Sequence, residues 1–181
     1  MVKRLSVVLS MALLATLAAS AGAQATQPEN PVELGIDAVI ASTVGSSPNF
    51  TQISVPDAEF RIGFFVSHDL SIEPRAGVAS ISGGGSTFTT YNGELGLLYH
   101  FTHSKRPGTG VYVRPFAGFS GASGGGNDTQ THVGIGLGTK IPFAERLATR
   151  LEANYGHSFS TGSSTGGNVI GASIGLSFFT R

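Results

Sequence analysis

The chain alternates apolar and polar residues with a period of two over most of its length. In the clearest stretch, residues 91–101 (YNGELGLLYHF), the odd-numbered positions carry mostly tyrosine, leucine and phenylalanine, and the even-numbered positions are mostly polar. Such alternation predicts a β-strand with one apolar face. Stretches of this kind follow one another along the chain, at 34–41, 59–66, 70–79, 91–101, 111–119, 133–143, 147–156 and 170–178.

These eight strands predict an all-β fold, an eight-stranded antiparallel up-and-down transmembrane β-barrel. The connections at 67–69 and 144–146 are tight, and 103–110 is a longer turn on the same side. Connections on the other side are mostly longer and rich in Gly, Ser and Thr, at 42–54, 82–87, 122–130 and 160–168. Short turns are typical of the periplasmic side of bacterial outer-membrane barrels. Pro74 and Pro115 fall inside strands, where we expect bulges because proline removes a ladder hydrogen bond.

The polar face of the strands carries balanced charge, which indicates which face points inward. A soluble barrel would turn this face outward, but it is mostly Gly, Ser and Ala with a few charges, and that composition suits a narrow lumen better. Charges inside a lumen must be paired, because an isolated buried ion costs several kcal/mol. We therefore predict a closed lumen holding an ion-pair network of five acids and five bases: Asp37, Glu59, Glu73, Glu94 and Glu152 with Arg61, Arg75, Arg114, Lys140 and Arg150.

Aromatic residues on the apolar face gather toward the strand ends. Two such girdles are typical of the bilayer interfaces. We predict an upper girdle of Phe60, Tyr91, Phe119 and Tyr155 and a lower girdle of Tyr99, Phe101, Phe143 and Phe178.

The composition agrees with export to a membrane. Charged residues make up 12% of the 181 residues, against roughly 25% in ordinary soluble domains. The chain has no Cys and no net charge, which excludes disulfides and argues against nucleic acid as a partner. A basic start, an apolar run and the small residues of 21–23 predict a cleavable signal peptide at 1–23, followed by a barrel domain at 24–181.

The chain resembles the small outer-membrane β-barrel family that includes the OmpA membrane domain and OmpX. The resemblance covers roughly residues 33–181 and is most specific at 60–66 (FRIGFFV), 70–75 (LSIEPR) and 171–179 (GASIGLSFF). It implies a monomer in the bacterial outer membrane, surrounded by lipid and lipopolysaccharide. It also implies insertion by the barrel assembly machinery, for which Phe179 near the end would be the aromatic signal.

The residues support a structural or surface-interaction role without catalysis, cofactor or metal. The five histidines show no metal-ligand spacing. One alternative is a narrow porin-like channel, and another is passage of small apolar molecules through a lateral opening, for which 160–168 is the best location. A third is a lipid A-modifying enzyme of the barrel deacylase type, with His157 and Ser158 or Ser160 near Glu152. That family's pattern requires an Asn after the Ser and a later acid, and both are missing here.

Overall fold

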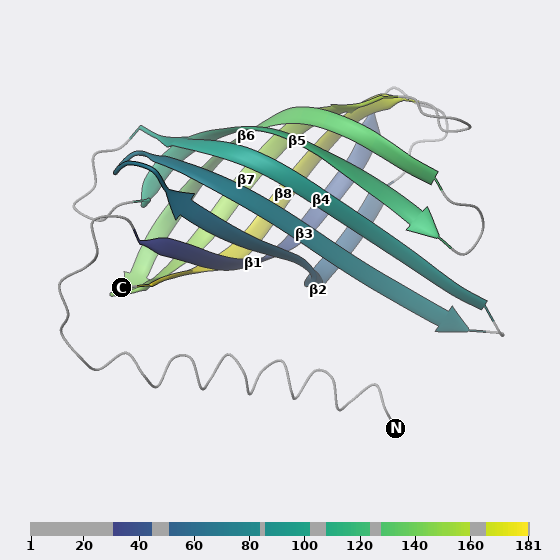
Figure 1. Ribbon diagram of the computed structural model, residues 1–181, viewed down its shortest axis with the longest axis horizontal. Helices are drawn as coiled ribbons and strands as arrows, with labels where there is room; N and C mark the ends of the chain where they lie inside the picture. Colours follow the sequence, from purple (N-terminus) through teal and green to yellow (C-terminus); the bar gives the residue numbers. More distant parts are fainter. Residues whose placement is uncertain are drawn as a thin grey trace.

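The computed structural model describes residues 31–44, 51–83, 86–101, 108–123, 128–159 and 166–180, which form a closed barrel. Each strand pairs antiparallel with the next, and β1 also pairs with β8, as Figure 1 shows. The prediction of eight antiparallel strands in sequential order is confirmed. The strands are β1 (Val32–Val44), β2 (Thr51–Phe65), β3 (Leu70–Gly83), β4 (Ser86–His100), β5 (Gly110–Ser123), β6 (Asp128–Ala144), β7 (Leu147–Ser158) and β8 (Gly167–Phe179). Among the described residues, no helix is long and apolar enough to span a membrane.

Side chains alternate between the outer surface and the lumen, and the apolar ones point outward. On β4, Leu95 and Leu97 are 57% and 44% exposed, whereas Leu98 and His100 are buried inside. The largest fully buried side chains among the described residues include arginines, and most of the exposed ones on the wall are apolar. This arrangement is the reverse of a water-soluble domain and suits a barrel surrounded by lipid.

The strands extend beyond the predicted stretches, mainly at the end with the longer loops. β6 begins at Asp128 rather than at 133, and β1 ends at Val44 rather than at 41. Both faces are polar there, so the alternation disappears from the sequence although backbone pairing continues.

The expected bulges at the two prolines are wrong. Pro74 pairs with Leu95, and Pro115 pairs with Ile135, without a register shift. The shifts lie elsewhere, between Asp37 and Val39 on β1 and between Pro142 and Ala144 on β6. Because Pro74 lacks an N–H, the β2–β3 ladder instead skips two pairs, Ile62–Pro74 and Gly63–Glu73, between Arg61–Arg75 and Phe64–Ile72.

One seam of the barrel is paired over only part of its length. The β2–β3 pairs run from Phe65–Ser71 up to Phe60–Ala76, and no pair joins 51–59 of β2 to 77–83 of β3, both of which are described. Figure 1 shows β3 and β4 diverging from β2 toward their loop ends, at the right of the picture. We call this unpaired part the β2–β3 seam.

The opposite end of the barrel is closed by aromatic rings and a turn. Phe65 and Phe179 are buried there with ring centroids 6.4 Å apart. Gly108 has a φ of 68° and lies so close to both rings that a Cβ at this position would overlap Phe65. Thr109 is also buried, which places the end of the 103–110 turn in the barrel mouth. The short turns lie at this end, which we therefore assign to the periplasm.

Candidate functional site

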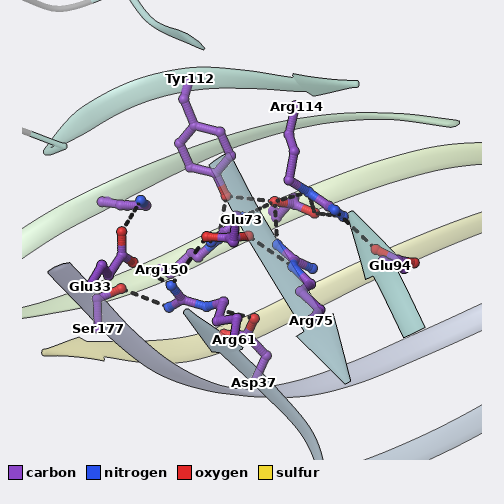
Figure 2. A network of polar contacts seen from close by, with 12 residues as sticks. Glu33, Asp37, Arg61, Glu73, Arg75, Glu94, Tyr112, Arg114, Arg150 and Ser177 are labelled. Atoms are coloured by element: carbon purple, nitrogen blue, oxygen red, sulfur yellow. Dashed lines mark hydrogen bonds and ion pairs between the residues drawn. The ribbon is translucent and has the colours of Figure 1, made fainter. Parts of the chain in front are cut away.

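The lumen is filled by a network of ion pairs centred on Glu152 of β7. The Glu152 carboxylate accepts hydrogen bonds from Arg75 at 3.1 Å, from Arg114 at 2.8 Å and from Arg150. The Tyr112 hydroxyl donates to the same carboxylate at 2.7 Å and accepts from Arg150 at 2.6 Å. These residues come from β3, β5 and β7, so the network joins strands from different parts of the wall (Figure 2).

A second acid, Glu73 of β3, shares two of these arginines. Arg75 donates to Glu73 at 2.9 Å and Arg150 at 2.6 Å. Arg61 lies 3.6 Å from the same carboxylate. Glu73 therefore connects the cluster around Glu152 to the β1–β2 side of the lumen.

The β1–β2 side is organised by Arg61. Its guanidinium donates to Asp37 at 2.9 Å, to Ser177 at 2.7 Å and also to Glu33. Lys140 of β6 donates to the other Glu33 oxygen. Both carboxylates lie on β1, and Arg61 lies on β2, so the pairs join neighbouring strands as well as opposite walls.

Water exposure in the lumen increases toward the outer end. Arg114 also donates to Glu94 at 2.9 Å, and His132 lies 3.2 Å from the other Glu94 oxygen. The side chains of Glu94 and His132 are 17% and 15% exposed, while those of Arg61, Glu73 and Arg150 are fully buried. The lumen is therefore accessible from outside down to Glu94 and dry below it.

Glycines on β6 make room for this network. A Cβ on Gly136 would lie 3.0 Å from the Glu152 carboxylate, and a Cβ on Gly138 would overlap the Tyr112 hydroxyl. Gly134 faces the Phe116 ring in the same way. The alternate glycines therefore create space for large side chains opposite.

The structure places all ten sequence-predicted charges on the lumen side and brings nine of them into ion pairs. Glu59 is the exception, since no ion pair joins it to a described residue. Sequence reasoning missed Glu33, which lies one residue before the first predicted stretch at 34–41. Glu33 lies two and four residues before Gly35 and Asp37, so the period of two places it on the same polar face. This period could have identified Glu33 as a lumen residue. The count among described lumen residues is therefore six acids to five bases rather than five to five.

Most of the aromatic residues predicted to form girdles point outward from the barrel wall. Six of the eight are exposed outward, and Tyr91 and Phe178 are partly buried. The Tyr91 hydroxyl lies 2.8 Å from Thr129. Phe60 pairs with Ile36 and lies nearer the periplasmic end of β2 than the outer end, so it does not share the level of Tyr91.

The residues considered for catalysis do not come together. His157 is exposed on the outer wall, where its Nδ1 lies 2.9 Å from the Asn168 side-chain oxygen and its ring contacts Phe159 edge to face. Glu152 points into the lumen and contacts the three arginines instead. Ser160 lies outside the described residues. Within the described ranges, no group of three or more His, Cys, Asp or Glu residues is arranged to hold a metal ion.

Comparison with known proteins identifies the family. Residues 9–178 match the family model of the outer membrane protein beta-barrel domain. The chain belongs to this family. It is a bacterial outer-membrane protein, and no curated protein matches its sequence.

Solved structures of small barrels share the fold. Neisserial surface protein A superimposes with a TM-score of 0.53 at 13% identity, over 85% of this chain and 99% of that one. The outer membrane protein OprG of Pseudomonas aeruginosa gives a TM-score of 0.49 at 10% identity, over 86% and 97% of the two chains. Ail, the attachment invasion locus protein of Yersinia pestis, gives 0.43 at 11% identity, over 86% and 100%. At these identities the likeness concerns the fold alone.

Proposed function

We propose that this outer-membrane protein is a closed barrel with a structural or surface-interaction role. The observation that supports the proposal is the ion-pair network that crosses the lumen, in which every described lumen base is paired with an acid. An eight-stranded barrel is just wide enough for its own side chains to fill it. A solute passing through this lumen would have to displace several buried ion pairs at once.

The periplasmic mouth provides a second barrier. The rings of Phe65 and Phe179, with Gly108 against them, occupy the opening below the network. Lys140 lies 5.8 Å from the Phe65 ring and 5.4 Å from the Tyr112 ring, so its ammonium group fills the space between the plug and the network. Both barriers argue against a porin-like channel.

Two observations argue against the deacylase alternative. The only acid near His157 in sequence is Glu152, which faces the other side of the wall and already has four hydrogen-bonding partners. The His157 ring instead lies within hydrogen-bond distance of the side-chain amide oxygen of Asn168. A Ser–His pair needs an acid or comparable group that orients the imidazole for proton transfer, and an amide supports this less well.

The proposal includes the export route. Residues 1–23 would be removed as a signal peptide, leaving 24–181 as the barrel domain, which the assembly machinery would insert among lipid and lipopolysaccharide. A surface ligand would meet the outer loops, of which residues 160–165 lie outside those the structure describes. We propose no cofactor and a monomeric state.

Liposome swelling tests the closed lumen. The refolded mature chain, reconstituted into liposomes, is expected to give no swelling above protein-free liposomes in isotonic arabinose or glycine. A known general porin reconstituted in parallel shows that the assay works. Swelling that increases with the amount of folded protein would contradict the proposal.

A lateral route for small apolar molecules is the second candidate, because one observation favours it. Such a route needs a break in strand pairing, and the β2–β3 seam supplies one. It lies between 51–59 and 77–83, whereas residues 160–165 of the stretch 160–168, where the sequence suggested an opening, lie outside the described residues. The seam would give access only to the outer part of the lumen, since the ion pairs continue below it. Faster uptake of an apolar dye into liposomes by the folded protein, lost when the seam is cross-linked, would favour this route.

A further inference from the structure

The lumen contains one carboxylate more than its bases can neutralise. Six acids face five bases among the described lumen residues, and Glu59 is the acid left without an ion pair. Glu59 is only 6% exposed, and its Oε2 atom has no hydrogen-bond partner among the described residues. A buried unpaired charge is costly, so a cation or a proton must neutralise this carboxylate.

A second acid lies beside Glu59. Asp37 is its partner in the β1–β2 register, and cross-strand partners on one face have Cβ atoms about 4.5–5.5 Å apart. Asp37 gives one oxygen to Arg61, while its Oδ1 atom is buried and unpartnered. Like charges directly opposite each other repel, and the Arg61 guanidinium contacts Asp37 but forms no ion pair with Glu59. Two unpartnered carboxylate oxygens therefore remain on adjacent strands.

The nearby bases are directed elsewhere. Arg61 points to Glu33, Asp37 and Ser177, and Arg75 points to Glu73 and Glu152. The other unpartnered buried side-chain atoms of the described residues are oxygens of Ser71, Asn92 and Ser173 and a ring nitrogen of His100, and of these Ser71 and His100 lie toward the periplasmic end. Asn92 lies near the level of Glu59. It pairs with Gly77, the residue after Ala76, and Ala76 forms the last β2–β3 pair with Phe60. This level of the lumen thus offers mainly acceptors.

The level of Glu59 lies close to the part of the lumen that is exposed from outside. Glu59 is the first β2 residue above the last β2–β3 pair, Phe60–Ala76, and lies at the start of the β2–β3 seam. From the outer end, the lumen is accessible down to Glu94 and His132.

We propose that one monovalent alkali cation, Na⁺ or K⁺, binds in the lumen at Glu59 and Asp37, with water completing its coordination. The charge argues for a monovalent ion, since the excess is a single negative charge. The acceptor oxygens are the ligands that hard cations prefer. A divalent ion would leave an excess of positive charge, and no group of three acidic or histidine ligands converges within the described ranges. The cation would neutralise the lumen and reduce the repulsion between the two carboxylates.

The test compares unfolding in different salts at equal ionic strength. Thermal unfolding of the detergent-folded protein is followed by circular dichroism in NaCl, KCl and choline chloride, because choline is too large for the site. The midpoint in NaCl or KCl is expected to exceed that in choline chloride by about 2–4 °C at a concentration several times the Kd. Glu59→Gln removes the charge but keeps the shape, and should abolish the difference. Glu145→Gln removes an exposed carboxylate in a turn and should retain it.

A direct measurement on the wild-type protein does not depend on how the variants fold. The ²³Na resonance should broaden in the presence of the folded protein, and K⁺ should reverse the broadening saturably. Equal salt responses of wild type and Glu59→Gln would overturn the proposal. A second result would also overturn it: the wild-type midpoint does not depend on the alkali cation, and its infrared spectrum contains a protonated-carboxyl band that Glu59→Gln removes. In that case a proton, and not a cation, neutralises Glu59. Neither result bears on whether the lumen conducts, which the swelling assay tests separately.

Discussion

Replacing Glu152 with glutamine should destabilise the barrel strongly while preserving its shape. The carboxylate accepts hydrogen bonds from Arg75, Arg114 and Arg150 and from the Tyr112 hydroxyl. Glutamine keeps one acceptor oxygen and places an NH₂ group among three guanidinium groups.

The magnitude follows from the remaining charges. Without the Glu152 charge, the three arginines keep only Glu73 and Glu94 as partners, so one buried positive charge is uncompensated. Breaking a buried ion pair by removing one partner costs about 3–5 kcal/mol. With an m value of about 2 kcal/mol per M of urea, that loss corresponds to a decrease of roughly 2 M in the unfolding midpoint.

The assay is equilibrium urea unfolding in lipid vesicles, read from the mobility of unboiled samples on a gel, because the chain has no Trp for fluorescence. The control is Glu145→Gln, which should unfold within about 0.5 kcal/mol of wild type since it changes an exposed surface position. If Glu152→Gln also unfolds within about 1 kcal/mol of wild type, the network does not carry the stability that its burial implies.

Two further predictions concern the network and the seam. Tyr112→Phe should cost about 1.5–3 kcal/mol in the same assay, because it removes hydrogen bonds to charged groups on both sides of the hydroxyl, and a cost near zero would place the hydroxyl outside the network. Because the chain has no Cys, the seam can be examined with cysteine pairs. Phe64→Cys with Ile72→Cys lies in a paired register and should oxidise roughly tenfold faster than Ala58→Cys with Val78→Cys, across the seam. Equal rates, measured by gel mobility without reductant, would mean that the seam is closed in the membrane.

The sequence predicts the number of strands, their order and the faces of the barrel, because each depends on a period of two. The strand ends cannot be predicted in this way, because backbone pairing continues where both faces of a strand are polar. Around Ser80 and Thr89, for example, the two hydroxyl groups lie 2.8 Å apart across β3 and β4, but no apolar face marks either strand.

The register and tilt of the strands determine which charged side chains form ion pairs. Neither can be read from the sequence. The near balance of acids and bases is visible, yet the choice of Glu33 rather than Glu59 as a partner of Arg61 is not. Glu33 was missed because the apolar alternation begins at Leu34, although β1 begins at Val32.

The β2–β3 seam has only a weak signal in the sequence. Pro56 lies in β2 beside the shift that moves the β1–β2 register between Asp37–Glu59 and Val39–Ser54. Proline in a central strand indicates irregular pairing, but it does not indicate whether β2 loses its pairing with β1 or with β3.

The closed lumen is tested most directly by planar-bilayer recording on the mature chain whose folding is confirmed by a mobility shift on boiling. The ion-pair network and the Phe65–Phe179 plug predict no steady conductance in wild type over long recordings in KCl. Stable, stepwise conductance that scales with the amount of folded protein would contradict the account, because ions would then be crossing a lumen that we describe as closed.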